Sequence, residues 1–344
     1  MDKDRINKKG CRKIPYKSKS NKKRKKLRFT NIVFLLIFEV VFVIITVPLL
    51  VVYGPFENAK KVYVGSAMGT MNHQYLAKWF LSDEKIDGII GKPSSNSSDE
   101  TTNINAVKIS KNIDDIIVPY TIDGNPKYKG YYLVVNDSNR VKIGTSSKLK
   151  TEGETTSEIA ENNGAIAAVN GGAFVDKTSV EWTGTGAFPD GIVISNGKVI
   201  WNSLSKDEKT ELFGITKDGV LIVGKYSENE LEKLGVQEAL SFGPVLIING
   251  KKTNITVDGG IAPRTAIGQK EDGSIILMVI DGRSLTSIGA SYKEVQDIMY
   301  KLEAVNAINL DGGKSTTMYY DGDIINTPSN SMGERTIPTA VIVK

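Results

Sequence analysis

The 344-residue chain has only one cysteine and one histidine, and this scarcity excludes several classes of functional site. Cys11 has no second cysteine to pair with, so neither an intrachain disulfide nor a cysteine metal cluster can form. His73 alone cannot build a histidine-rich zinc site, and the main domain contains no histidine for a Ser-His-Asp triad. These exclusions remove most hydrolase mechanisms before any motif is considered.

Charge is distributed unevenly along the chain. Residues 1–28 hold 14 Lys and Arg against two Asp, whereas the remaining residues include 30 basic and 37 acidic ones. The high overall pI thus comes from a short basic tail, and the large remainder is acidic. No nucleic-acid partner is expected for it.

An apolar stretch follows the basic tail directly. Residues 32–52 are long enough to cross a hydrocarbon core of about 30 Å. The basic cluster at residues 22–26 predicts a cytoplasmic N-terminus by the positive-inside rule. We therefore expect a single-pass protein of the cell membrane, anchored by its N-terminal helix, with its catalytic domain extracellular. A cleaved signal peptide is the alternative, although the apolar run exceeds the usual length of such a segment.

Composition divides the rest of the chain. Residues 91–103 are small and polar and are typical of a linker. We predict a cytoplasmic tail at 1–28, a transmembrane helix at 29–53, a stalk and linker at 54–104, and one domain at 105–344. Short apolar runs separated by turn residues predict an α+β fold, with a large, mostly antiparallel sheet and a few packed helices.

Turn dipeptides and capping residues place most elements of that domain. Four hairpins are expected around Asn-Gly or Asp-Gly pairs at 196–197, 218–219, 272–273 and 321–322. A fifth strand pair is expected at residues 131–135 and 141–145. Helices are predicted after the capping box at Ser291, after Ser227, and from 156 to 163.

Two helix-to-strand units end in the same way. One apolar strand leads into Asn170-Gly171-Gly172, and another leads into Asp311-Gly312-Gly313. A polar residue followed by two glycines allows a ligand to approach the backbone closely. Either motif alone is also compatible with a simple tight turn.

Further motifs complete a family pattern. These are Gly243-Pro244 with Asn249-Gly250, the segment PRTAIG at 263–268, Asp281-Gly282-Arg283, and NLDGGKST at 309–316. Together with the Asn170 motif they resemble the phosphodiester glycosidase family, whose animal member removes N-acetylglucosamine from a phosphodiester on mannose. The resemblance covers residues 130–343, and Lys314 stands where the family often has glycine.

The resemblance implies a hydrolase that cleaves a sugar-1-phosphodiester on the glycosidic side. With the predicted membrane anchor, we expect a membrane-anchored extracytoplasmic glycosidase that acts on cell-envelope or exopolysaccharide glycans. Asp311 is expected as the carboxylate at the anomeric carbon and Arg264 as the phosphodiester ligand, with Asp281 as a third catalytic candidate. Asp190 is a second acid candidate. The expected substrate-binding residues are Asn170, Gly171, Gly172, Arg283, Gly312, Gly313, Lys314, Ser315 and Thr316.

Two other functions stay open at this stage. One is a non-catalytic module that binds a cell-wall glycan or teichoic acid, and the other is an ordinary glycosidase with two carboxylates. No cofactor is required by the sequence. A calcium or magnesium ion held by Asp311 and Asp281 is compatible with it but not demanded.

Overall fold

The computed structural model describes residues 29–68, 74–90, 100–109, 116–122, 125–175, 185–256, 259–330 and 332–344. The predicted tail at 1–28 and most of the predicted linker, residues 91–99, lie outside these ranges. The chain divides into two units, residues 1–50 and 51–344. Each unit is described by itself.

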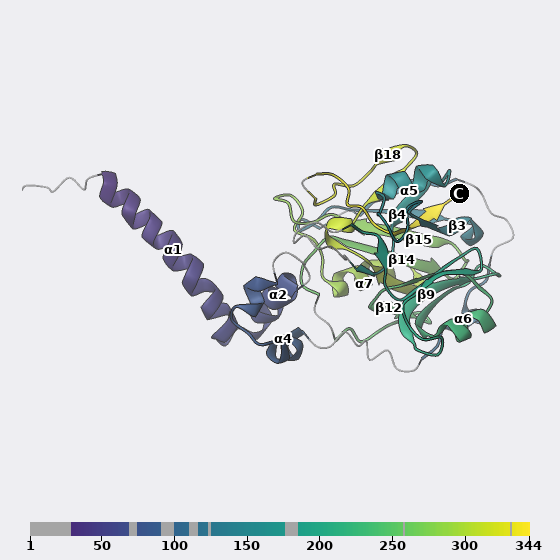
Figure 1. Ribbon diagram of the computed structural model, residues 1–344, viewed down its shortest axis with the longest axis horizontal. Coiled ribbons are helices and arrows are strands. Elements are labelled where there is room, and N and C mark those ends of the chain that lie inside the picture. Colours follow the sequence, from purple (N-terminus) through teal and green to yellow (C-terminus); the bar gives the residue numbers. More distant parts are fainter. Residues whose placement is uncertain are drawn as a thin grey trace, which may run out of the picture. The chain divides into compact units, whose positions relative to one another are not determined.

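Helix α1 (Phe29–Tyr53) contains the predicted apolar segment. Figure 1 shows it as one continuous helix, although it includes Pro48. Residues Asn31–Tyr53 have a mean hydropathy of 3.0, and their length and composition suit a membrane span. A signal sequence near an N-terminus has the same properties. The expected apolar helix is therefore confirmed, and its anchoring role stays a proposal.

Three short helices follow in the region predicted as a stalk. They are α2 (Glu57–Met68), α3 (Tyr75–Lys78) and α4 (Asp83–Ile90). They share a small apolar cluster that includes Val64, Ala77 and Ile86. The Tyr63 hydroxyl donates a hydrogen bond to the Leu76 carbonyl at 3.0 Å, which links α2 to the segment of α3.

Three large antiparallel sheets organise the remaining described residues, and the predicted α+β class is confirmed. The largest has seven strands in the order β1 (Pro119–Thr121), β2 (Gly130–Val135), β15 (Ile275–Ile280), β14 (Arg264–Lys270), β16 (Ala304–Leu310), β12 (Val245–Ile248) and β13 (Lys251–Lys252). A five-stranded sheet has the order β10 (Leu221–Tyr226), β9 (Thr210–Thr216), β11 (Val236–Ser241), β7 (Ile192–Ser195) and β8 (Lys198–Asn202). A second five-stranded sheet has the order β18 (Asp323–Ile324), β17 (Met318–Tyr320), β4 (Ala167–Asn170), β19 (Thr339–Val343) and β3 (Val141–Thr145), and β5 (Phe174–Val175) pairs with β6 (Phe188–Pro189).

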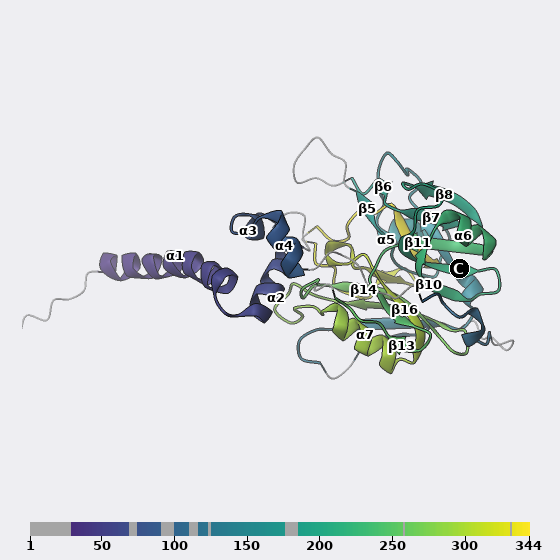
Figure 2. The same cartoon turned by 90° about the horizontal axis from the view of Figure 1, so that it is seen from below.

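The main core lies where the inner faces of these sheets meet. Its members come from all three large sheets and include Leu277, Phe213 and Val341. The other face of the seven-stranded sheet packs against α7 (Tyr292–Lys301), which buries Val295 and Met299 there. Figure 2 shows α7 beneath β14 and β16, and Figure 1 shows α5 (Thr156–Asn162) beside β4. Helix α6 (Glu228–Lys233) packs on β11.

The four hairpins expected at Asn-Gly and Asp-Gly pairs are all present. In the β7–β8 hairpin, Asn196 and Gly197 have φ values of 48° and 71°. Two successive positive φ values are the conformation that Asn-Gly favours in two-residue hairpin turns. The helices at Ser291, Ser227 and Thr155 each begin with a capping box.

The expected pairing of residues 131–135 with 141–145 is wrong. Both segments are strands, but β2 pairs with β1 and β15, whereas β3 pairs with β19 in another sheet. The Asp137 side chain accepts a hydrogen bond from the Asn139 amide and begins the short 3-10 helix η2 (Ser138–Arg140). The connection therefore carries the chain from one sheet to the next. The other 3-10 helices described are η1 (Ile104–Ala106) and η3 (Gly313–Ser315).

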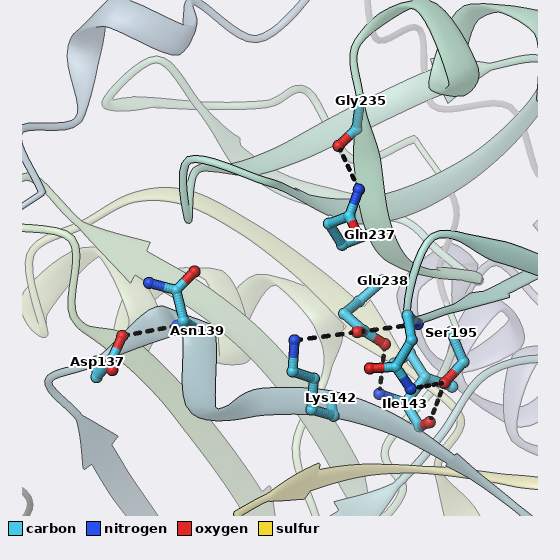
Figure 3. A network of polar contacts seen from close by, with 9 residues as sticks. Asp137, Asn139, Lys142, Ile143, Ser195, Gly235, Gln237 and Glu238 are labelled. Atoms are coloured by element: carbon cyan, nitrogen blue, oxygen red, sulfur yellow. Dashed lines mark hydrogen bonds and ion pairs between the residues drawn. The ribbon is translucent and has the colours of Figure 1, made fainter.

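A buried carboxylate joins the two five-stranded sheets. Glu238 on β11 is 1% exposed and accepts hydrogen bonds from the Ile143 amide at 2.8 Å and the Asn196 amide at 3.1 Å. Lys142 Nζ lies 3.3 Å from the same carboxylate. Figure 3 shows β3 and the β7–β8 turn gathered around it. Burial raises the pKa of the Glu238 carboxyl.

Candidate functional site

Strands β14 and β16 bring the two central candidates to one edge of the seven-stranded sheet. Thr265 lies opposite Leu310, so Arg264 at the start of β14 and Asp311 after the end of β16 occupy the next pair of positions. Thr265 and Leu310 are fully buried. Because side chains alternate between the two faces of a strand, Arg264 and Asp311 belong to the opposite face, toward α7.

A cavity of about 290 Å³ lies at this edge. Its lining includes Asp311 and Arg264, together with Gly312 and Gly313 from the predicted substrate-binding set. The sequence analysis did not identify the other residues that line it, which are Gly65, Met68, Phe242, Gly259, Ala262, Tyr292 and Asn309.

Arg264 is held rigidly in the cavity wall. Only 5% of the residue is exposed, and its guanidinium lies 4.0 Å from the centre of the Tyr292 ring. Nε donates to the Ala290 carbonyl at 2.9 Å, and Nη2 donates to the carbonyls of Gly259 and Gly260 at 2.8 and 2.6 Å. These contacts fix the plane of the guanidinium, and Nη1 forms no hydrogen bond with any described residue. Because Nε and both Nη2 protons already donate inside the protein, Nη1 is the nitrogen left to donate to a phosphate oxygen.

Arg283 adds a second positive charge beside the cavity. A Cβ atom at Gly313 would lie 3.3 Å from Arg283 Nη2, so the two residues are in close contact. Burial lowers the pKa of Arg283, the charge of Arg264 lowers it further, and Asp311 acts in the opposite direction. Arg283 keeps part of its surface in solvent and remains a cation. Two mutually repelling guanidiniums near one carboxylate form a field that favours a bound anion.

The backbone around Asp311 is fixed from two sides. The Asp311 amide donates to the Gly171 carbonyl at 3.2 Å, and the Gly313 amide donates to the Pro263 carbonyl at 2.9 Å. A Cβ at Gly312 would lie 2.7 Å from the Pro263 carbonyl oxygen, so a larger residue does not fit there. The Asp-Gly-Gly motif therefore lets the chain pass close to β14.

The Asn170 motif lies behind the cavity rather than in its lining. Asn170 is fully buried, and its Nδ2 donates to the Asp311 carbonyl at 2.5 Å. Its Oδ1 accepts from Thr265 Oγ1 at 2.6 Å and from the Thr317 amide at 3.2 Å. Cβ atoms at Gly171 and Gly172 would collide with backbone oxygens of neighbouring segments. These three residues support the strand ends, and Asn170 uses its Oδ1 and an Nδ2 proton inside the protein.

The two other acid candidates, Asp281 and Asp190, are also absent from the cavity lining. Asp281 is 3% exposed, and its Oδ1 accepts from Asn326 Nδ2 at 3.0 Å and from the Thr327 amide at 2.9 Å. Burial raises the pKa of Asp281, against the effect of these hydrogen bonds. Asp190 accepts from the Gly191 amide and from Ser203 Oγ. Both carboxylates are used to hold loops.

Lys314, Ser315 and Thr316 follow the cavity in the chain, and none of the three lines it. Ser315 Oγ and Thr316 Oγ1 are buried and have no hydrogen-bond partner in the described part of the chain. Within the same ranges, no group of three or more His, Cys, Asp or Glu side chains is arranged to hold a metal ion.

Asn309 was detectable from the sequence, because it lies two residues before Asp311 on one strand and alternation places both on the same face. Tyr292 and Phe242 gave no comparable signal. They reach the cavity only through the packing of α7 and of the segment after β11.

Comparisons with known proteins identify the family. The family model for phosphodiester glycosidases matches residues 163–344. The bovine N-acetylglucosamine-1-phosphodiester alpha-N-acetylglucosaminidase is 32% identical over 196 residues, which are 51% of this chain and 35% of the bovine protein. The mouse enzyme of the same name is 29% identical over 195 residues, with 51% and 36% covered. The chain therefore spans about a third of the length of these curated relatives.

A solved structure also shares the fold. It is the zebrafish N-acetylglucosamine-1-phosphodiester alpha-N-acetylglucosaminidase catalytic domain, described as auto-inhibited by its pro-peptide. The TM-score is 0.58 at 23% identity, and the match covers 71% of this chain and 88% of the zebrafish chain. The family model covers more than half of the sequence, and the chain belongs to the phosphodiester glycosidase family.

Proposed function

We propose that the chain hydrolyses a phosphodiester that links the anomeric carbon of N-acetylglucosamine to a second alcohol, with cleavage on the glycosidic side. The observation that carries the proposal is that Asp311 and Arg264 line one small cavity from adjacent strands. The family of hydrolases to which the chain belongs supports the reaction, and the names of the bovine and mouse relatives supply the sugar.

Each charged group has a distinct task in this reaction. Arg264 holds the phosphodiester through its oriented guanidinium, and Arg283 adds positive charge on the same side. Asp311 faces the anomeric carbon, where positive charge develops as the bond to oxygen lengthens. The electron pair of the broken C–O bond leaves with the phosphate oxygen. Because a phosphate monoester has a second pKa of about 6, the leaving group departs without a strong acid beside it.

Water completes the balance of atoms. Its oxygen becomes the new hydroxyl on the anomeric carbon and keeps one proton, and the one proton it loses passes through Asp311 or to the solvent. Asp311 acts either as a base toward this water or as a nucleophile that forms a glycosyl intermediate first. We keep both routes, since each gives the same products.

The ordinary two-carboxylate glycosidase is less well supported. It needs a second carboxyl group within about 10 Å across the cleaved bond. Asp281 and Asp190 do not line the cavity, and each already accepts hydrogen bonds from neighbouring loops. Asp281 instead suits a positioning role. It comes directly after β15 and accepts a hydrogen bond from the Thr327 amide, which fixes the chain two residues before Arg283. The other alternative, a non-catalytic glycan-binding module, would bind such a substrate without hydrolysing it.

The proposal is tested with methyl N-acetylglucosamine-1-phosphate as substrate. Wild-type protein should release methyl phosphate and N-acetylglucosamine. Asp311→Asn should abolish turnover, and its circular dichroism spectrum should stay unchanged. Asp190→Asn is the matched control, because it removes a carboxylate outside the cavity and should retain activity. Binding of the substrate by wild-type protein without turnover would favour the glycan-binding module.

We further propose that α1 anchors the domain outside the cell, where it acts on envelope or exopolysaccharide glycans. The length and hydropathy of residues Asn31–Tyr53 and the basic residues before them support this arrangement. Full-length protein in sealed cells should stay with the membrane in alkaline carbonate. External protease should degrade residues 105–344. Release of the protein into the medium would indicate a cleaved signal instead.

We also propose that α2 restricts access to the cavity. Gly65 and Met68, both of α2, belong to the cavity lining. Ser66 lies against Gly260, since a Cβ atom added at Gly260 would lie 2.6 Å from Ser66 Oγ. The zebrafish catalytic domain is described as auto-inhibited by its pro-peptide, so limited access has a precedent in the family. A phosphodiester with a large second alcohol requires this segment to move.

A further inference from the structure

Asn309, which lines the cavity together with Arg264 and Asp311, has one unused hydrogen-bond acceptor. The residue is 1% exposed. Its Oδ1 is buried and has no hydrogen-bond partner in the described ranges of the chain. A buried amide oxygen without a partner is less stable than a satisfied one. A ligand donor that reaches this atom from the cavity is therefore favoured.

The orientation of the amide is fixed by its other end. Asn309 Nδ2 donates to the Gly243 carbonyl at 3.1 Å and to the Leu310 carbonyl at 2.7 Å, which uses both of its protons. Rotation of the amide by half a turn would set Oδ1 against these two carbonyl oxygens. The side chain can therefore offer a ligand an acceptor and no donor.

The position of Asn309 relative to Asp311 follows from strand geometry. The two residues are separated by one residue, Leu310, whose side chain is buried on the other face of the sheet. Residues i and i+2 of a strand share a face and lie about 7 Å apart. Ala266, opposite Asn309 on β14, is small and leaves space at this point of the sheet. An acceptor thus lies about one sugar ring away from the proposed catalytic carboxylate.

We infer that Asn309 is a specificity-determining residue, whose Oδ1 accepts a hydrogen bond from the N–H of the 2-acetamido group of the sugar. The inference rests on the proposed function. The substituent on C2 is the one next to the reacting carbon, and it reaches past Asp311 toward Asn309. An amide N–H is only a donor, which matches a group that is only an acceptor. The rings of Phe242 and Tyr292 line the same cavity and can contact the acetyl methyl group.

The decisive experiment varies the sugar and the protein together. Three methyl 1-phosphodiesters are compared, with an acetamido group, an O-acetyl group or a hydroxyl on C2. The O-acetyl compound keeps the shape of the acetamido group and lacks the N–H. Wild-type kcat/KM should fall by about 10- to 100-fold from the acetamido to the O-acetyl compound, because Oδ1 is then left unpaired.

Asn309→Ala should reduce this ratio to near one, since the partner of the N–H is removed. An unchanged ratio in Asn309→Ala would overturn the inference. If that variant does not fold, as judged by its circular dichroism, the wild-type ratio decides alone, and equal rates on the two compounds would overturn it. Absence of turnover on all three compounds by wild-type protein would instead contradict the proposed function.

Discussion

The side-chain amide of Asn170 donates a hydrogen bond to the backbone carbonyl of Asp311 at 2.5 Å, from the end of one sheet to the end of another. The same side chain accepts from Thr265 Oγ1 and from the Thr317 amide. All of these groups are buried or nearly so. Asn170 therefore connects β4, β14 and the Asp-Gly-Gly segment, and it fixes the backbone position of Asp311, the proposed catalytic carboxylate.

Asn170→Ala should lower both stability and turnover. It leaves buried partners on three segments unsatisfied, so the free energy of unfolding should fall by about 2–4 kcal/mol in urea titrations. Activity should fall mainly in kcat, because Asp311 is displaced while Arg264 still binds phosphate. Asn139→Ala is the control: this exposed residue (Figure 3) should change stability by less than about 0.5 kcal/mol. Full stability and full kcat in Asn170→Ala would contradict the role.

Arg264→Lys should impair the enzyme despite the retained charge. Lysine cannot reproduce the stacking on Tyr292 or the three hydrogen bonds to backbone carbonyls that orient the guanidinium. We expect kcat/KM to fall by about 10- to 100-fold, largely through KM. Arg335→Lys is a matched control, because Arg335 also lies over an aromatic ring, that of Phe174 at 4.8 Å, and does not line the cavity. A similar loss in both variants would point to general destabilisation.

Glu228 should make stability depend on pH. Hydrogen bonds from Asn202 hold the pKa of this carboxyl below its usual value, burial opposes them, and Lys206 adds to the lowering. A lowered folded-state pKa stabilises the protein above the unfolded pKa, and this stability is lost as pH falls through the folded pKa. Glu228→Gln should thus cost about 1–3 kcal/mol at pH 7 and less at pH 3 in urea titrations. The exposed Glu232→Gln should show no such difference, and an equal cost of Glu228→Gln at both values would refute the assignment.

Met68→Ala should open the cavity if α2 limits access. The change removes bulk from the cavity wall without altering any charged group. We expect a lower KM for phosphodiesters with a large second alcohol and little change for the methyl compound. Met332→Ala serves as the control, since Met332 is 89% exposed and not part of the lining. Unchanged KM values for every substrate would show that α2 is no barrier.

Local sequence signals predicted the hairpin turns and the starts of helices well. Asn196-Gly197 and the capping box at Ser291 act within a few residues, and both gave the observed elements. The pairing of β2 was missed because its partner β15 lies about 140 residues further along. Alternating apolar residues predict a strand but do not predict which other strand it pairs with.

The residues that line the candidate cavity could be predicted to a similar extent. Asp311 and Arg264 both carry recognisable motifs and do share a cavity. Asn170 has an equally strong motif, yet its hydrogen-bonding groups are used inside the protein. Whether a motif lines the cavity depends on which strand ends lie together in the fold, and the motif itself does not contain this information. Tyr292 reaches the cavity from a helix whose capping residues indicated only where it begins.

In the proposed reaction, Asp311 and Arg264 direct cleavage to the bond between the anomeric carbon and the bridging oxygen. The decisive measurement is hydrolysis of methyl N-acetylglucosamine-1-phosphate in water enriched in oxygen-18, followed by mass spectrometry of both products. The label should appear in N-acetylglucosamine and not in methyl phosphate. Label in methyl phosphate would mean attack at phosphorus and would rule out the proposed reaction.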